Sequence, residues 1–104
     1  QLLDQVLQLG GGVDAVFFCN DDLAQGALLA ANRLGLAVPT QIAIAGFTAL
    51  PGSAQMVPPL TTIHTPRSAI GAQAATMLLQ LVQGQPVAQN RLDLGYHLVR
   101  RAST

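Results

Sequence analysis

The fold of this chain is decided by the stretch Ala15-Val16-Phe17-Phe18-Cys19-Asn20-Asp21-Asp22. An apolar run without alternation predicts a strand that is buried on both faces, as in a parallel sheet. The segment 21–34 that follows is typical of a helix. The Asn-Asp-Asp triplet places polar side chains at the carboxyl end of a strand, where small molecules bind in open α/β sheets. Capping of the helix explains the same three residues, and on spacing alone it is the more common role.

A second buried strand is predicted over 41–45, within the run Gln41-Ile42-Ala43-Ile44-Ala45-Gly46-Phe47. A helix between two buried strands forms a βαβ unit, whose strands run parallel. The first strand is expected over 15–19, and both strands are expected to be nearly inaccessible to solvent. The sequence therefore predicts an α/β fold with a mostly parallel open sheet flanked by helices.

Further elements flank this unit. They are a helix over 1–9, a short strand over 60–64, a helix over 66–82 and a last strand over 92–99. Gly10-Gly11-Gly12 ends the first helix, and Pro66 is tolerated near the start of the later one. The chain closes with Arg101-Ala102-Ser103-Thr104.

The composition is unusually apolar for an independent domain of 104 residues, with 50% hydrophobic and 10% charged residues. Its mean hydropathy is +0.40. No apolar run approaches the roughly 20 residues of a membrane span. We therefore expect that a partner chain, or further parts of a larger protein, cover much of the surface.

Charge and cysteine content narrow the class of protein. Five Arg and no Lys balance five acidic residues, so no basic stripe indicates direct contact with nucleic acid. Cys19 is the single cysteine, which excludes a disulfide, and it is expected to be a small buried hydrophobe. The chain opens with no signal peptide, so a cytoplasmic location is expected.

Catalytic and metal-binding patterns are missing from the sequence. His64, His97 and Cys19 are isolated, which argues against a metal site, and no cofactor is expected. Ser53 has no recognisable base, and the adjacent Asp21 and Asp22 point in different directions at a helix start. What remains is a binding edge at the strand ends, where Asn20, Asp21 and Thr48 suit a polyhydroxylated ligand.

Five motifs occur in a fixed order from about Asp14 to the last residue. They are Phe18-Cys19-Asn20-Asp21-Asp22-Leu23-Ala24-Gln25-Gly26-Ala27, Arg33-Leu34-Gly35-Leu36-Ala37-Val38-Pro39, Ile42-Ala43-Ile44-Ala45-Gly46-Phe47, Pro58-Pro59-Leu60-Thr61-Thr62-Ile63 and Arg101-Ala102-Ser103-Thr104. This ordered set resembles the lactose-repressor (LacI/GalR) family of bacterial transcription regulators. Asn-Asp-Asp-Leu-Ala, Ala-Ile-Ala-Gly-Phe and Thr65-Pro66-Arg67 look most like its gluconate-repressor branch.

The resemblance implies a domain organisation. Family members carry an N-terminal helix-turn-helix domain and a two-lobed effector domain that is similar to a periplasmic sugar-binding protein. This chain resembles the C-terminal part of that effector domain, an incomplete lobe without the DNA-binding module. The implied boundaries are 1–63 for the C-terminal lobe, 66–84 for a helix of the other lobe, and 91–104 for the terminal strand and tail.

The resemblance also assigns roles to residues. Asn20 matches the asparagine at the strand end that meets the effector. Asp21 matches the neighbouring aspartate of the same motif, which is often involved in positioning or in ligand contact. Thr48 stands where many members have an aspartate or asparagine that binds sugar hydroxyls. A carboxylate at that position would repel an anionic effector and a hydroxyl would not, so Thr48 favours a sugar acid such as gluconate.

Subunit contacts in the family imply a homodimer interface on the helix after Asn20 and on the loop before Pro58. The matching residues are Gln25, Leu28, Leu29 and Met56, for which core packing is the alternative role. A repressor's effector-binding and dimerisation region, not an enzyme, is thus the main functional hypothesis. A periplasmic-type sugar-binding protein of the same fold is the alternative.

Overall fold

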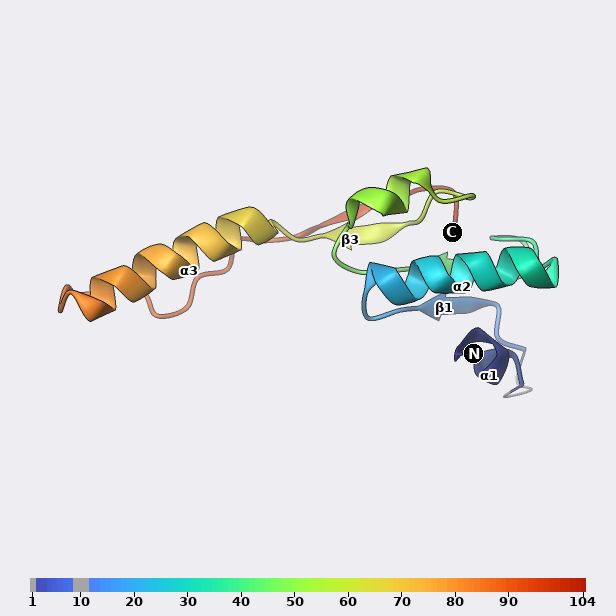
Figure 1. Cartoon of the computed structure of the whole chain (residues 1–104), viewed down its shortest axis with the longest axis horizontal. Coiled ribbons are helices and arrows are strands. Elements are labelled where there is room, and N and C mark those ends of the chain that lie inside the picture. Colours follow the sequence, from blue (N-terminus) through green and yellow to red (C-terminus); the bar gives the residue numbers. More distant parts are fainter. Residues whose placement is uncertain (1, 9–11) are drawn as a thin grey trace. The chain divides into compact units, whose positions relative to one another are not determined.

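The computed structural model describes residues 2–8 and 12–104 of the chain (Figure 1). It divides into two units. The sheet unit comprises Gln1–His64 and His97–Thr104, and the α3 unit comprises Thr65–Tyr96. Each unit is described by itself below.

The sheet unit contains two helices, a 3-10 turn and four short strands among its described residues. Their bounds are α1 Leu2–Gln8, β1 Ala15–Phe17, α2 Asp21–Leu34, β2 Ala43–Ala45, η1 Pro51–Gln55, β3 Thr62–His64 and β4 His97–Val99. The predicted end of the first helix at Leu9, and the turn at Gly10-Gly11, lie outside the described residues.

The unit β1–α2–β2 is the predicted parallel βαβ unit. Strand β1 pairs with β2 in parallel, with Ala15 opposite Ala43 and Phe17 opposite Ala45. Helix α2 joins them and packs against β2, and Figure 1 shows it lying along the strands. The predicted α/β fold with a parallel sheet is confirmed.

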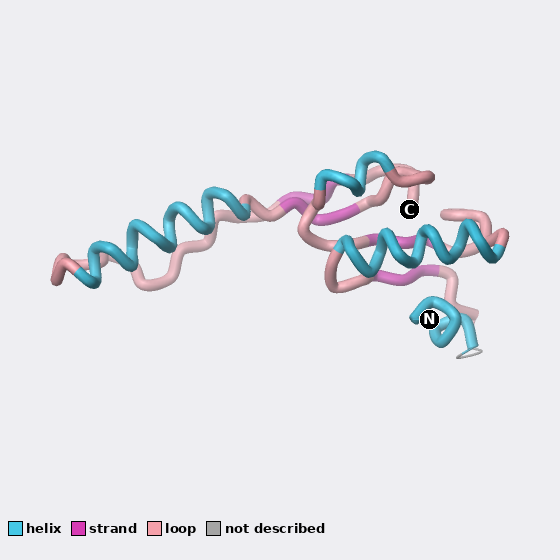
Figure 2. The backbone as a smooth tube through the Cα atoms, viewed as in Figure 1, coloured by secondary structure: helices cyan, strands magenta, loops and turns pink. Residues whose placement is uncertain are grey.

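Strands β3 and β4 form an antiparallel pair, drawn in magenta and side by side in Figure 2. His64 lies opposite His97, and their imidazole rings stack with centroids 4.6 Å apart. A parallel bridge from Ala45 to Thr61 connects β2 to the residue before β3. This bridge brings the start of β3 to the free edge of β2.

The hydrophobic core lies between α2 and the sheet. Its apolar members are the buried face of α2, residues of β2 and its approach, and three more distant side chains: Ala24, Ala27, Leu28, Ala30, Ala31, Ile42, Ile44, Leu3, Phe18 and Leu60. On α2 these residues recur at helical spacing, so one face of the helix is buried. The position of α2 fixes where its N-terminal residues, Asn20 and Asp21, lie.

The C-terminal tail is tied to the sheet by Ser103, which is fully buried. Its backbone N–H donates to the Pro59 carbonyl at 3.0 Å, and its carbonyl accepts from the Ile44 N–H at 2.9 Å. Its hydroxyl accepts from the Thr61 N–H at 2.8 Å and donates to the Ile44 carbonyl. The tail, which follows β4, therefore adds hydrogen bonds to Ile44 of β2.

Two details of the predicted fold are wrong. The predicted first strand, 15–19, is not inaccessible: Ala15 is exposed, Phe17 is 61% exposed, and Cys19, which follows β1 and was expected to be buried, is exposed. The last strand begins at His97 rather than residue 92. Gly95, at φ +78°, donates its N–H to the Asp93 carboxylate, and this turn interrupts the strand.

The α3 unit is built on one helix, α3, which spans Arg67–Val82. Pro66 precedes the helix as its N-cap rather than lying inside it, one residue from the predicted start. None of the residues of α3, all of which are described, is buried. No helix in the described part of the chain is long and apolar enough to cross a membrane.

Candidate functional site

The candidate site lies where the two parallel strands end. Because β1 and β2 are in register, Phe17 and Ala45 are partners, and the residues after both strands meet at one edge of the sheet. This arrangement brings the turn at Asn20 close to the loop that contains Gly46 and Thr48. The carboxyl edge of a parallel sheet is the usual location of a ligand site in this class of fold.

Asn20 caps α2 and remains partly accessible. Its backbone is extended at φ −154°, and its side-chain Oδ1 accepts from the Leu23 N–H at 2.9 Å. Its Nδ2 group has no hydrogen-bond partner among the described residues. Asn20 therefore caps the helix through its oxygen and still presents two N–H groups at the edge.

Asp21 is fully buried, with 0% of its surface exposed. Its Oδ2 accepts from the Leu50 N–H at 2.8 Å and from the Ser53 hydroxyl. Its Oδ1 accepts from the Thr62 hydroxyl at 2.6 Å. Of the two roles expected for Asp21, positioning and ligand contact, this geometry favours positioning, because the chain's own donors already occupy both oxygens.

Thr48 is half-buried and lies in an unusual backbone conformation. Its φ is +101°, and that of Ala49 is +51°. Non-glycine residues rarely adopt positive φ, and such outliers concentrate at binding sites. The Thr48 N–H donates to the Ile63 carbonyl at 2.9 Å, and its hydroxyl has no hydrogen-bond partner among the described residues. Thr48 thus offers a hydroxyl group at the same strand-end edge of the sheet as Asn20.

Two polar residues of this region were missed by sequence reasoning. Ser53 and Thr62 are fully buried and donate to Asp21 from positions 32 and 41 residues away along the chain. Ser53 also accepts from the Gln25 side-chain amide at 3.1 Å. Thr62 belongs to the family-like motif that begins at Pro58, so the sequence did mark this segment. Nothing in the motif, however, indicates that Asp21 is the hydrogen-bond partner of Thr62.

The four residues expected at a dimer interface fall into different environments. Leu28 is fully buried in the core, so the structure corrects its predicted role: its side chain packs within its own chain. Leu29, the next residue of α2, is 57% exposed. Gln25 is partly buried by its bond to Ser53, and Met56 packs against the core while remaining partly accessible.

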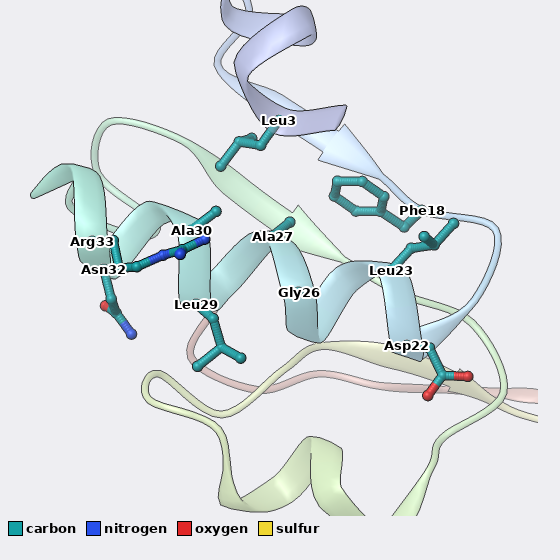
Figure 3. Close-up of a pocket in the computed structure, with 10 residues that line it drawn as sticks. All are labelled: Leu3, Phe18, Asp22, Leu23, Gly26, Ala27, Leu29, Ala30, Asn32 and Arg33. Atoms are coloured by element: carbon teal, nitrogen blue, oxygen red, sulfur yellow. The ribbon is translucent and has the colours of Figure 1, made fainter. Parts of the chain in front are cut away.

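An apolar groove of about 700 Å³ lies along α2. In Figure 3, Leu3 of α1 faces Ala27 and Ala30 of α2, and Phe18 lies beside Leu23. Asn20 and Thr48 do not line this groove. Its lining is mainly apolar, as in surfaces that contact other protein segments.

No group of three or more potential metal ligands gathers within residues 2–8 and 12–104. Every buried side-chain nitrogen and oxygen in the described chain has a hydrogen-bond partner. The chemistry offered at the edge is therefore hydrogen bonding by an amide and a hydroxyl, with the neighbouring carboxylate already engaged.

The sequence from residue 4 to residue 104 matches the periplasmic binding protein-like domain family. The chain belongs to this family. The HTH-type transcriptional regulator GntR of Pseudomonas aeruginosa is 55% identical over 104 residues, which are 100% of this chain and 30% of that protein. IdnR, an HTH-type transcriptional regulator of Escherichia coli, is 45% identical over 98 residues, which are 94% of this chain and 30% of that protein.

Solved structures agree with the sequence relatives. The transcription regulator GntR from Chromobacterium violaceum has a TM-score of 0.90 at 51% identity, covering 98% of this chain and 38% of that one. The Lac repressor bound to ONPG has a TM-score of 0.87 at 38% identity, covering 100% of this chain and 31% of that one. The resemblance to the C-terminal part of a LacI/GalR effector domain is confirmed.

These matches also bear on the class of protein. The relatives are named as transcription regulators and repressors, so the reading that this chain is not an enzyme is confirmed. This chain spans about 30% of the length of the sequence relatives, and its likeness to them is therefore a likeness to one part of each.

Proposed function

We propose that this chain is the effector-binding and dimerisation portion of a transcriptional repressor that senses a sugar acid such as gluconate. The observation that carries the proposal is the 55% identity to a transcriptional regulator along the whole chain. Relatives named as regulators favour this function over that of a periplasmic-type sugar-binding protein. We place the intact regulator in the cytoplasm, where it meets DNA.

The proposed effector site is the edge that contains Asn20 and Thr48. The Asn20 amide donates to ligand oxygens, and the Thr48 hydroxyl both donates and accepts. A related regulator, CelR, is known in complex with the sugar cellobiose, and it has a TM-score of 0.90 at 28% identity to this chain. The neutral hydroxyl of Thr48 supports an anionic ligand, because a carboxylate at the same position would repel a sugar acid.

DNA binding is assigned to a part of the regulator outside this segment. The chain has five basic and five acidic residues, a balance that leaves this segment without the net positive charge that favours phosphate contacts. The sequence relatives are named as HTH-type regulators, and a Lac repressor dimer is known bound to operator. We propose that a helix-turn-helix module contacts DNA while this portion binds the effector and the partner subunit.

We propose that the partner subunit contacts α2 near Leu29, together with Gln25 and Met56. Leu29 is a large apolar side chain exposed on a helix whose other face forms the core. Covering such an apolar side chain with a second subunit removes it from water and stabilises the dimer. We further propose that residues 1–63 belong to the C-terminal lobe, that the helix at 66–84 belongs to the other lobe, and that 91–104 form the terminal strand and tail. Sedimentation of the intact regulator tests the dimer.

Fluorescence anisotropy of the intact regulator on its own promoter DNA tests the function. Gluconate is expected to change the affinity for DNA and glucose to have little effect, because an effector acts only through its preference for one arrangement of the protein. Asn20→Ser keeps an oxygen that caps α2 but removes the amide, so it should weaken the gluconate response by about 1–3 kcal/mol with little loss of stability.

The same titration provides the contradicting result. A regulator whose DNA affinity is unchanged by gluconate and by other sugar acids would not be a sugar-acid sensor. An Asn20→Ser variant that responds like the wild type would remove Asn20 from the effector site. The family assignment stands on the sequence match in either case.

A further inference from the structure

We propose that Asp21 is a positioning residue: its buried carboxylate, acting through Thr62, holds Thr48 and Ala49 in the conformation that presents Thr48 to the effector. The inference rests on the proposed function of the strand-end edge. The family resemblance leaves positioning and ligand contact open for Asp21, and the inference names the loop that Asp21 positions and the residue, Thr62, through which it acts.

The first step is the strain in the loop. Thr48 and Ala49 have φ values of +101° and +51°, and neither is glycine. A β-branched residue such as threonine is a particularly rare occupant of this region of backbone space. Residues stay in such conformations only where the surrounding structure holds them there. The contacts of this loop therefore determine where the Thr48 hydroxyl lies.

The second step is the set of contacts that hold the loop. Three consecutive backbone N–H groups are anchored: Thr48 donates to the Ile63 carbonyl at 2.9 Å, Ala49 to the Thr62 hydroxyl at 3.2 Å, and Leu50 to the Asp21 Oδ2 at 2.8 Å. Two of the three acceptors thus belong to Thr62 and Asp21. Both of these residues are fully buried, so water does not replace their bonds.

The third step is the direction of the Thr62 hydroxyl. It donates its single proton to the Asp21 Oδ1 at 2.6 Å. With the proton committed to Asp21, the lone pairs of the hydroxyl are left to accept from the Ala49 N–H. Asp21 therefore acts on Leu50 directly and on Ala49 through Thr62.

The fourth step is the room made for the carboxylate. A Cβ atom on Gly46 would lie 2.3 Å from the Asp21 Oδ1 and 3.1 Å from the Ala24 Cβ. Only glycine allows the backbone after β2 to pass this close to Asp21. The carboxylate accepts from three donors, which an amide of the same shape cannot do, because half of its polar group is a donor.

The experiment measures gluconate affinity by calorimetry on the intact regulator. Thr62→Val removes the hydroxyl at nearly constant volume and is expected to weaken binding about tenfold, as for the loss of a buried hydrogen bond. Thr62→Ser keeps the hydroxyl and should bind like the wild type. Thr76→Val is the matched control, because the Thr76 hydroxyl bonds only to the Ala72 carbonyl within α3.

A glycine at Ala49 separates positioning from general destabilisation. Glycine adopts positive φ without strain, so Thr62→Val combined with Ala49→Gly should regain several-fold of the lost affinity. Asp21→Asn should weaken binding at least as much as Thr62→Val, and Asp22→Asn, its exposed neighbour in the first turn of α2, should not. A purely structural role for Asp21 and Thr62 predicts no recovery of affinity by Ala49→Gly.

Hydrogen exchange of residues 47–50 in the same intact protein gives a second readout that needs no ligand. Faster exchange there in Thr62→Val and Asp21→Asn, but not in Thr76→Val or Asp22→Asn, supports positioning. Unchanged exchange and affinity in both buried-site variants would overturn it, as would a double variant that regains no affinity. A wild type that binds no sugar acid would defeat the proposed function, while the exchange pattern would still decide whether Asp21 holds the loop.

Discussion

Helices α2 and α3 are both rich in apolar residues but differ in what they bury. The 14 residues of α2 include six that are buried, whereas none of the 16 residues of α3 is. An Asn20 side chain caps α2 at one end and Gly35, at φ +69°, ends it at the other, while α3 has no side-chain cap. The apolar content of a helix alone therefore does not show whether its residues are buried in a core. That depends on the segments that pack against the helix.

Truncation of one leucine in each helix tests this comparison with the largest expected effect. Leu28→Ala in the 104-residue chain should lower the free energy of unfolding by about 3 kcal/mol, because Leu28 is fully buried and a cavity would remain. Leu79→Ala should change it by less than about 0.5 kcal/mol, since Leu79 is 58% exposed. Urea unfolding measures both.

Equal losses of unfolding free energy for the two leucine variants in this chain would contradict the comparison. In the intact regulator the two losses should become more similar, because we propose that α3 belongs to the other lobe. The remaining parts of that lobe would cover the apolar residues of α3. An unchanged, negligible cost of Leu79→Ala in the intact protein would argue against that domain assignment.

Two glycines provide a smaller contrast. Gly46→Ala should cost about 2 kcal/mol, because its new Cβ would overlap the Asp21 carboxylate in a packed interior. Gly71→Ala in α3 should instead stabilise the chain by about 0.5–1 kcal/mol. A Cβ atom on Gly71 would meet nothing within 4 Å beyond its chain neighbours and the nearby backbone of its own helix, and alanine favours a helix interior. Thermal unfolding of the two variants compares them, and effects of the same sign would contradict the packing described for Gly46.

Much of the fold could be predicted because its signals are local. The apolar run, the polar triplet and the glycine after Leu34 together predict the bounds of α2, and two apolar runs around a helix predict the parallel pair. The exposure of Phe17 could not be predicted, because a continuous apolar run indicates a strand that can be covered on both faces but does not show whether the cover lies within these residues.

The candidate site was harder to predict than the fold. The position of Asn20 at the strand end follows from sequence, and so does its capping of α2. The burial of Asp21 does not, because its donors come from Leu50, Ser53 and Thr62, which approach only after the chain has folded. The same long-range packing separates Leu28 from Leu29, neighbours on a helix that face the core and the solvent.

The central claim is that Thr48 leaves the strand-end edge able to accept an anionic sugar acid, and calorimetric titration of the intact regulator tests it most directly. Wild type, Thr48→Asp and the neutral control Thr48→Asn are each titrated with gluconate and with glucose. Asp and Asn both tolerate positive φ, so neither adds backbone strain at this position.

We predict that wild type prefers gluconate. We also predict that Thr48→Asp binds gluconate about tenfold or more weakly than Thr48→Asn does, with a smaller change for glucose, because the new carboxylate repels only the anion. A wild type that prefers glucose, or an aspartate that weakens both ligands equally, would contradict the claim.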